Sequence, residues 1–456
     1  MMKGYLTIFL SLSLSLLAGF ILLFTGMAIQ NAQKIRLECV LDTSMNAVLS
    51  EYHIGLLERY GLLYIDASYL GQEPRLSNVE ARLSYYLLEN ADSPWGNLNI
   101  NQVNIVAFDT AAAENGASLR HQVITYIQDT GIKMEEANVL GYLGEVQILD
   151  GQDVQSEFSN IMGQLAGMEL PTIMNDLGLI EEVPLSNPAD WVYGLVGSDV
   201  MYLADINLGT VSNAGIPLGD YYSHRQISNI AGRSRNYKQN SEQFLNYLFY
   251  QMSWLGKPRD DTLLSCELEY LLKGQASDID NVRAVAQMLF RWRLADNVNL
   301  ALSDGELRTA AQIAAQELQA VQLKEEFESP VTESILYACA YLETIGDMKV
   351  IYSGGKIPLR KAAHSMSVEY VKNGTVYRSN NSNGLPYAKY LACGLLLLDD
   401  KTLNARTMDV MEMDIRAFSE NKLFAMDWCI ESYEAVVTAS AEKQGNYQLR
   451  RRYGYF

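Results

Sequence analysis

The sequence predicts an α+β protein, in which an N-terminal transmembrane helix continues into an amphipathic stalk helix and then a mixed helix and sheet exported domain. Three observations predict it: an uncharged apolar run near the amino terminus, a periodic apolar stripe directly after it, and alternating strand-like and helix-like segments beyond. The 456 residues are 48% hydrophobic, an ordinary fraction, so membrane character must lie in one segment.

The apolar run extends from Leu6 to Ile29, and no charged residue interrupts it. About 20 apolar residues suffice to span a bilayer, whereas the apolar part of a cleavable signal has only about 7 to 15. The length therefore favours a retained anchor over residues 1–30. A cleaved signal peptide is the alternative, because residues 26–28 (Gly-Met-Ala) form a small-x-small triplet of the kind that signal peptidase accepts.

Small residues recur along this helix at a helical spacing and predict a face on which another transmembrane helix packs. They are Ser11, Ser15, Ala18, Gly19 and Gly26. The alternative is that such residues are simply common in membrane helices, since no strict G-x-x-x-G occurs. The tail before the span is very short, so we expect a single-pass protein of the cell membrane with the long C-terminal part outside.

An apolar stripe with three-to-four-residue spacing follows the anchor and predicts a stalk helix over residues 31–60. The stripe is Leu37, Leu41, Met45, Val48, Tyr52 and Leu56. We expect it to pack on the chain's own domain, with packing on a partner as the alternative. Beyond it, a first α/β unit is predicted over residues 61–190, ending in a linker with Pro171, Pro184 and Pro188, and a second α+β unit over residues 191–456.

Within these units the local patterns predict individual elements. Strands are expected over residues 62–65, 103–108, 244–254 and 263–272, the last two paired around Gly256 and Pro258, and a hairpin near the C-terminus through residues 436–438 and 447–449. Helices are expected over residues 78–89, 117–128, 282–297, 307–323, 332–344, 387–398 and 404–418, the third of them capped by Ser277 or Asp278.

The charge balance excludes one class of partner. With 54 acidic and 35 basic residues the net charge is −19, which repels phosphate backbones, so no nucleic acid is expected to bind. The only basic run is Arg450, Arg451 and Arg452. We interpret it as a solvated final strand, with contact to acidic lipid or protein as the alternative.

No catalytic, cofactor or metal constellation is recognisable, so a non-enzymatic protein is predicted. The four histidines lack zinc-type spacing, and Gly354-Gly355-Lys356 lacks the other residues of a phosphate loop. Two S-x-x-K matches, at Ser353 and Ser419, lack the companion S-D-N and K-T-G signatures.

Two further patterns have structural interpretations. Glu267 and Glu269 would share one side of a strand, and we expect a solvated edge or salt-bridge partners there, with a glycosidase or cation site as the alternative. Cysteines are expected to be small core residues, although one bridged pair stays open. The five are Cys39, Cys266, Cys339, Cys393 and Cys429.

A segment rich in Gly, Asn and Ser over residues 197–236 predicts a long loop. Aromatic and cationic side chains lie together in it, which makes it a possible binding loop, with plain surface as the alternative. The residues concerned are Tyr221, Tyr222, His224 and Arg225.

The N-terminal run over residues 3–12 (KGYLTIFLSL) resembles the start of TadE/TadG-like minor pseudopilins of tight-adherence pilus systems. The segments at residues 56–62, 267–274 and 406–409 are similar to an uncharacterised family of TadG-like single-pass proteins of Gram-positive bacteria. The resemblance implies an outward-facing component encoded with pilus or secretion machinery and no catalytic residues. One departure is Phe9, which stands where a pilin processed after Gly4 carries Glu, and this argues against such processing.

These observations favour a structural or assembly protein. Its expected partners are membrane lipid and other pilus or envelope proteins, contacted through the N-terminal helix. A surface binding or adhesion module is the second hypothesis, and a cell-envelope hydrolase acting through Ser353 or Ser419 is the third.

Overall fold

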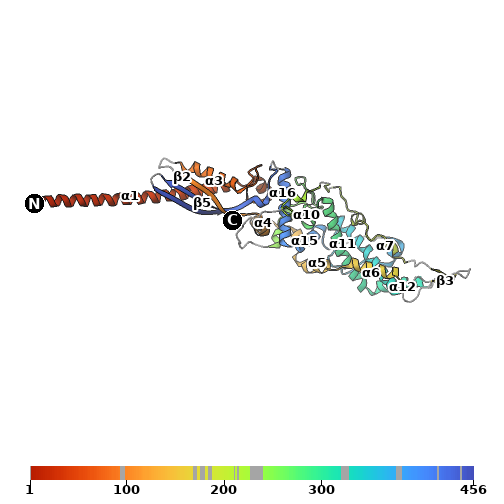
Figure 1. Cartoon of the computed structure of the whole chain (residues 1–456). Helices are drawn as coiled ribbons and strands as arrows, with labels where there is room; N and C mark the ends of the chain where they lie inside the picture. Colours follow the sequence, from red (N-terminus) through yellow and green to blue (C-terminus); the bar gives the residue numbers. More distant parts are fainter. Residues whose placement is uncertain are drawn as a thin grey trace. The chain divides into compact units, whose positions relative to one another are not determined.

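The computed structural model describes residues 2–92, 98–167, 172–174, 180–182, 187–209, 211–212, 215–225, 240–319, 328–375, 383–418, 421–441 and 444–455 (Figure 1). The chain forms two compact units. Unit 1 comprises Met1–Tyr126, Asp220–Gln239 and Met408–Phe456, and unit 2 comprises Ile127–Gly219 and Asn240–Thr407. Both chain ends therefore belong to unit 1, and the stretches that form unit 2 are inserted between its parts.

Unit 1 combines a long helix with a small sheet. Its elements are α1 (Met2–Leu49), α2 (Ile54–Tyr60), β1 (Ile65–Asp66), α3 (Leu76–Ala91), β2 (Leu98–Thr110), most of α4 (Ala113–Thr130), the C-terminal half of α16 (Asp400–Phe418), the short 3₁₀ turn η5 (Met426–Trp428), β5 (Cys429–Ala441) and β6 (Gln444–Gly454). The predicted strand over residues 103–108 and the predicted C-terminal hairpin are confirmed as parts of β2 and of β5 with β6.

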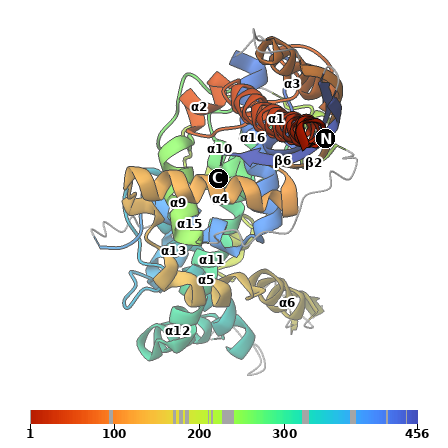
Figure 2. The same cartoon turned by 90° about the vertical axis from the view of Figure 1, so that its left-hand side faces the viewer.

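Strand β5 is the centre of the sheet. It pairs antiparallel with β2 along one edge and with β6 along the other, and β1 pairs with its first residues. The register places Ile105 opposite Ala435 and Val437 opposite Leu449, so that alternate residues form one apolar face. Helices α1 and α3 pack on that face, and their buried side chains complete one core with it (Figures 1 and 2).

The predicted stalk helix is interrupted. Helix α1 ends at Leu49, and α2 begins at Ile54 after Tyr52 has formed a bridge with Ile65. The backbone N–H of His53 donates to the carbonyl of Tyr64 at 2.8 Å, so this stretch belongs to the sheet edge and not to a helix. Apolar spacing alone continues through the break, which is why the sequence predicted one helix.

Unit 2 is mainly helical. Its elements are η1 (Glu135–Ala137), η2 (Leu140–Tyr142), α5 (Leu143–Asp150), α6 (Val154–Gly167), β3 (Thr172–Met174), β4 (Ile180–Glu182), α7 (Asp190–Tyr193), α8 (Val200–Leu203), α9 (Ser241–Gln251), α10 (Glu267–Lys273), α11 (Asp278–Ser303), α12 (Gly305–Gln319), α13 (Glu328–Tyr352), α14 (Val368–Asn373) and α15 (Tyr387–Leu397). The 3₁₀ turn η3 (Leu218–Asp220) ends one of its stretches.

Helices α11 and α13 form the core of unit 2. Both are buried along most of their length, and α12, α10 and α6 pack around them. The predicted cap is confirmed, since the side chain of Ser277 accepts a hydrogen bond from the N–H of Asp280 at the start of α11. The predicted helices over residues 282–297 and 332–344 lie within α11 and α13, and the helix predicted over residues 387–398 is α15, which ends one residue earlier.

A network of buried charges joins α11 to α13. Arg293 contacts Asp347 and Asp296, each at 3.0 Å, and Lys361 contacts Asp347 at 3.0 Å and Glu343 at 2.5 Å. All five residues are buried. Opposite charges and backbone carbonyls satisfy these groups in place of water, and this makes their burial tolerable.

The paired strands predicted over residues 244–254 and 263–272 are wrong, because these segments form helices α9 and α10. The side chain of Asn240 accepts from the N–H of Gln243 and caps α9, and Gly274 ends α10 in the left-handed conformation. Both helices are buried on nearly all sides, so their apolar runs show no helical period.

The predicted division at residue 190 does not coincide with the two units. Unit 1 is closed by pairing between β2 and β5, which are separated by more than 300 residues, and local sequence patterns carry no information about such pairing. Of the predicted linker prolines, Pro171 and Pro184 lie outside the described residues, and Pro188 falls just before α7.

Candidate functional site

The first half of α1 is an apolar surface that nothing in the described chain covers. From Leu6 to Ile29 the large apolar side chains are exposed, with Leu22 at 73% and Phe9 at 69%. The helix is long and apolar enough to cross a membrane. An exposed apolar surface of this extent is unstable in water, so lipid or another protein must cover it unless it is removed as a signal sequence.

Three hydroxyl side chains of this segment are satisfied within the helix itself. The hydroxyls of Ser11, Ser15 and Thr25 donate to backbone carbonyls three or four residues earlier, at 2.7–2.9 Å. Such internal bonds leave no unpaired donor toward an apolar environment. Of the predicted packing residues, Ser11, Ser15, Ala18 and Gly19 are exposed and Gly26 is partly exposed, and a Cβ added at Gly19 or Gly26 would meet no atom of the described chain within 4 Å.

The second half of α1 belongs to the core of unit 1. Leu37, Leu41, Met45 and Val48 are fully or almost fully buried against α3 and the sheet. The expected packing of the stripe on the chain's own domain is therefore confirmed for these four residues. One helix thus presents apolar side chains outward along its first half and inward along its second.

Polar contacts hold the second half of α1 at several positions along its length. Arg451 of β6 lies 3.7 Å from Glu38 and 3.8 Å from Asp42, and the amide of Asn90 donates to the hydroxyl of Ser44 at 3.2 Å. The guanidinium of Arg36 donates to the carbonyl of Ala91. These groups are partly exposed, so each contact contributes little free energy, but together they fix the rotation of the helix.

The last turn of α1 is capped by two tyrosines. The hydroxyl of Tyr433 donates to the carbonyl of Met45 at 3.1 Å, and that of Tyr455 donates to the carbonyl of Leu49 at 2.5 Å. The last four carbonyls of a helix have no partner inside it, so the bond from Tyr455 satisfies the carbonyl of Leu49, while the bond from Tyr433 adds a second partner to the carbonyl of Met45. The end of α1 is thus fixed by side chains from the final strands.

The basic run at the C-terminus is paired inside unit 1. Arg450 donates to Glu434 at 2.5 Å, and Arg452 contacts Asp109. Arg451 faces the carboxylates of α1 described above. All three guanidiniums therefore have acidic partners within the sheet and its covering helix.

The predicted binding loop is held against α16 within unit 1. Arg225 forms a two-point contact with the carboxylate of Glu412, at 2.8 and 2.7 Å, and also contacts Asp427. Burial raises the pKa of Glu412 and the hydrogen bond from Arg225 opposes that shift. Arg225 is thereby occupied by the protein's own carboxylates.

The aromatic residues of this loop are differently placed. Tyr221 is 7% exposed, with the Arg416 guanidinium 5.3 Å from its ring centre, and Tyr222 is half-buried. His224 is exposed, with its ring nitrogen 2.7 Å from the hydroxyl of Ser223. Most of the predicted loop beyond Arg225, residues 226–236, lies outside the described residues.

The weak catalytic matches have no supporting geometry. Ser353 lies in an exposed turn at the end of α13 and donates to the carbonyl of Val350 at 3.1 Å, and Lys356 is exposed. Ser419 lies outside the described residues. Among the residues that the structure describes, no group of three His, Cys, Asp or Glu side chains is arranged to hold a metal ion.

The glutamate pair has a structural role that the sequence did not reveal. Glu267 and Glu269 are buried in α10, so the expected solvated edge is wrong. Their carboxylates accept hydrogen bonds from the N–H groups of Ser253, at 2.6 Å, and Leu255, at 2.9 Å. Burial raises the pKa of Glu269 to about 7.

All five cysteines are free thiols, so no pair of them forms a disulfide bond. Cys266, Cys339, Cys393 and Cys429 are buried, as expected, whereas Cys39 is exposed on α1.

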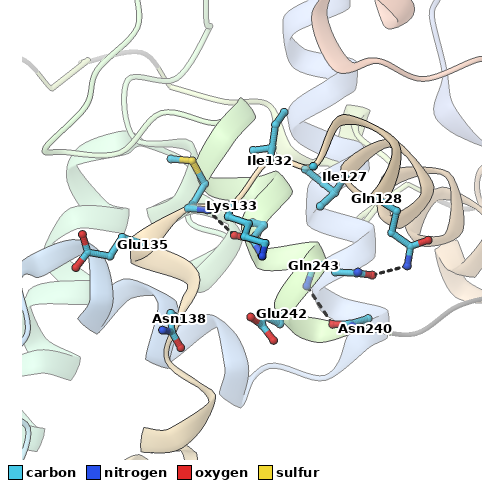
Figure 3. Close-up of a pocket in the computed structure, with 12 residues that line it drawn as sticks. Ile127, Gln128, Ile132, Lys133, Glu135, Asn138, Asn240, Glu242 and Gln243 are labelled. Carbon is cyan, nitrogen blue, oxygen red and sulfur yellow. Dashed lines mark hydrogen bonds between the residues drawn. The ribbon is translucent and has the colours of Figure 1, made fainter.

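A cleft of about 630 Å³ lies within unit 2, between the segment that leaves α4 and the start of α9 (Figure 3). Its lining is Ile127, Gln128, Gly131, Ile132, Lys133, Met134, Glu135, Asn138, Asn240, Glu242, Gln243 and Asn246. Side-chain amides dominate its polar surface. No local sequence pattern predicts this cleft, because its two walls are more than 100 residues apart.

A family model described as "Family of unknown function (DUF5702)" matches residues 179–441, which is more than half of the chain. No curated protein and no solved structure matches the chain. The matched residues include the buried charge network of α11 and α13 and end at β5.

Proposed function

We propose that this chain, which belongs to the DUF5702 family of unknown function, is a non-enzymatic, single-pass membrane protein that acts as a structural or assembly component of the cell envelope. In this proposal the first half of α1 stays in the membrane as an anchor. Units 1 and 2 lie outside the cell, and the partners are pilus or envelope proteins.

The continuity of α1 is the observation that carries the proposal. The apolar segment from Leu6 to Ile29 has a helical length of about 36 Å, somewhat more than the roughly 30 Å of bilayer hydrocarbon. The first fully buried residue of α1, Leu37, follows Ile29 by only about 12 Å along the helix axis. Unit 1 would therefore sit at the membrane surface, attached by a rigid helix.

This arrangement suits assembly better than catalysis. A rigid connection transmits the orientation of the anchor to the sheet, so neighbours that pack along the anchor would also align their outer units. The similarity of residues 3–12 to TadE/TadG-like minor pseudopilins supports a relation to tight-adherence pilus or secretion machinery. The paired arginines and the carboxylate-bound Arg225 support a structural use of the charged residues that looked functional in sequence.

Membrane retention tests the anchor. The natural protein should stay in the membrane pellet after alkaline carbonate washing, and protease added to intact cells should digest both units. Leu17→Arg places a charge in the centre of the span at a cost of roughly 3 kcal/mol and should reduce insertion. Ile35→Arg, a matched change outside the span, should leave retention unchanged.

A second measurement addresses the partners. A photo-crosslinking residue in place of Phe9 or Phe20, both exposed on the anchor, should capture pilus or envelope proteins in native membranes. If the crosslinking residue captured only lipid, the proposed assembly role would be contradicted. A mature chain found in the medium and beginning near Ile29 would contradict the anchor itself.

A further inference from the structure

A second pocket of unit 2 is lined by cations and by no carboxylate. It has a volume of about 450 Å³, and its lining residues come from α8 and the turn before it, α10, α11 and α13. Lys273, the last residue of α10, and Arg291 of α11 line it, whereas no Asp or Glu does. Its charge is thus opposite to the net charge of −19 of the whole chain, and we call it the basic pocket.

The ammonium of Lys273 is half-buried without a carboxylate partner in the described chain. It donates to the thioether sulfur of Met288 at 3.3 Å, which is a weak acceptor. Burial, assisted by the charge of Arg291, lowers the pKa of Lys273 to about 8. Asp150 of α5 opposes this shift, and Arg406 of α16 adds to it. An anion in the pocket would therefore offset the cost of holding this cation out of water.

Arg291 differs from the other two arginines of α11. Arg283 and Arg293 are each paired with carboxylates, whereas Arg291 is exposed and forms no ion pair with any described residue. Asp153 is within electrostatic range of Arg291, but its carboxylate accepts hydrogen bonds from the N–H and hydroxyl of Ser156. The guanidinium at the pocket is therefore not neutralised by contact within the described chain.

Two neutral polar side chains and two aromatic rings also line the pocket. Gln287 of α11 is exposed and Ser198 is half-buried, and both can donate a hydrogen bond to an oxyanion. Phe290 and Tyr341 supply an apolar surface, with ring centres 5.2 Å apart in an edge-on arrangement. The hydroxyl of Tyr341 donates to the carbonyl of Leu195 at 3.2 Å, so this residue offers its ring and not its hydroxyl.

We propose that the basic pocket binds a phosphate monoester, whose dianionic phosphate contacts Lys273 and Arg291. Its organic group lies against the rings of Phe290 and Tyr341. Two cations match two negative charges, whereas a carboxylate would compensate only one of them. Guanidinium and ammonium groups are both common ligands of phosphate in proteins. The volume of about 450 Å³ lies within the range of small-molecule sites and leaves room for an organic group beside the phosphate.

This binding site goes beyond the proposed envelope role and does not depend on the membrane anchor. Its occupancy can be measured at Lys273 in the purified full-length protein in detergent. An acetylating reagent is added, and mass spectrometry gives the rate of acetylation at each lysine. Phenyl phosphate, an aromatic monoester, should slow acetylation of Lys273 by about tenfold at saturation and leave the exposed Lys356 unchanged.

Sodium chloride at the same ionic strength is the control for charge screening, and it should leave the acetylation of Lys273 unchanged. Absence of protection at Lys273 would overturn the proposal. Equal protection by chloride, or equal protection of Lys356, would do the same.

Two variants each remove one cation of the pocket. Lys273→Met and Arg291→Gln should each weaken the binding of phenyl phosphate by about tenfold or more in isothermal titration calorimetry. Lys356→Met changes the net charge by the same amount outside the pocket and should bind as the natural protein does. Hydrogen exchange across α11 verifies that each variant is folded. Unchanged affinity in both pocket variants would contradict the assigned site.

Two comparisons test the class of ligand. Phenyl phosphate should bind more tightly than benzoate, which carries one charge, and than inorganic phosphate, which lacks the ring. Its affinity for the natural protein should fall between pH 7 and pH 9 as Lys273 loses its proton, and Lys273→Met should lack this fall. A preference for benzoate or inorganic phosphate, or the same fall in the variant, would refute the assignment.

Discussion

The core that α1, α3 and the sheet form in unit 1 and the core that α11 and α13 form in unit 2 differ in their buried charges, although unit 1 buries Glu412 beside Arg225 elsewhere. In unit 1 the core between α1, α3 and the sheet is apolar, and its charged pairs, such as Arg451 with Glu38, lie at the periphery. In unit 2 the charges of Arg293, Asp347 and Lys361 lie at the centre, between α11 and α13. Apolar packing thus positions α1 in unit 1, whereas directional ionic contacts hold α11 and α13 together in unit 2.

The largest effect should follow from breaking the central network. Asp347→Asn removes the carboxylate shared by Arg293 and Lys361 and leaves two buried cations without full compensation, which costs roughly 3–5 kcal/mol. Hydrogen exchange monitored by mass spectrometry should rise across α11 and α13. Asp280→Asn, which breaks an exposed pair with Arg283, should cost below about 1 kcal/mol. Equal effects of the two changes would refute the central role of the network.

The apolar core around α1 in unit 1 should be sensitive to a cavity. Leu41→Ala removes a fully buried side chain from the α1 face and should cost about 2–5 kcal/mol, seen as faster exchange in α3 and β5. Ile35→Ala, on the same helix but 61% exposed, serves as the control. If exchange in unit 2 rose as much as in unit 1, the two units would not be independent folding units.

Glu269 should give the stability of unit 2 a pH dependence. Burial raises the pKa of Glu269 to about 7, above its unfolded value of 4.5, so the folded state binds this proton more tightly. The contribution is fully present below pH 4.5 and is lost as the pH rises through 7, by an amount on the order of 3 kcal/mol. Denaturant unfolding at pH 5 and pH 8 should show the loss, and Glu269→Gln should reduce the difference. If the free energy of unfolding of Glu269→Gln changed between pH 5 and pH 8 as much as that of the natural protein, other titratable groups would be responsible for the pH dependence.

The smallest expected effect concerns the end of α1. Tyr433→Phe removes the hydroxyl that donates to the carbonyl of Met45 and should cost about 1 kcal/mol in the stability of unit 1. Tyr202→Phe, at an 81% exposed position of unit 2, is the matched control. A null result for both would mean that water replaces the tyrosine at the helix end.

Much of the local structure was predictable, because the responsible signals are local. The apolar length of the first half of α1, the stripe from Leu37 to Val48, the cap at Ser277 and the terminal hairpin all follow from periods and capping residues within one element. Helices α9 and α10 were missed because burial on several sides removes the polar face on which a helical period depends.

The long-range features could not be read from the sequence. Arg225 looked available for a ligand, since its partner Glu412 is almost 190 residues away. Glu267 and Glu269 were predicted to lie at the surface. Their hydrogen-bond donors are the N–H groups of Ser253 and Leu255, and no local sequence pattern identifies these donors. The cleft of unit 2 was not predicted for the same reason, since its two walls are far apart in the sequence.

The core of unit 1 can be completed only late in synthesis, because it combines the first and the last segments of the chain. The ribosome makes α1 first, but β5 and β6, which bury its second half, follow about 380 residues later. At 5–20 residues per second, Leu37 and its neighbours wait roughly 20–80 s for their packing partners. Throughout that interval the second half of α1 presents an unfinished hydrophobic surface, which stays open to unwanted contacts until the last strand emerges.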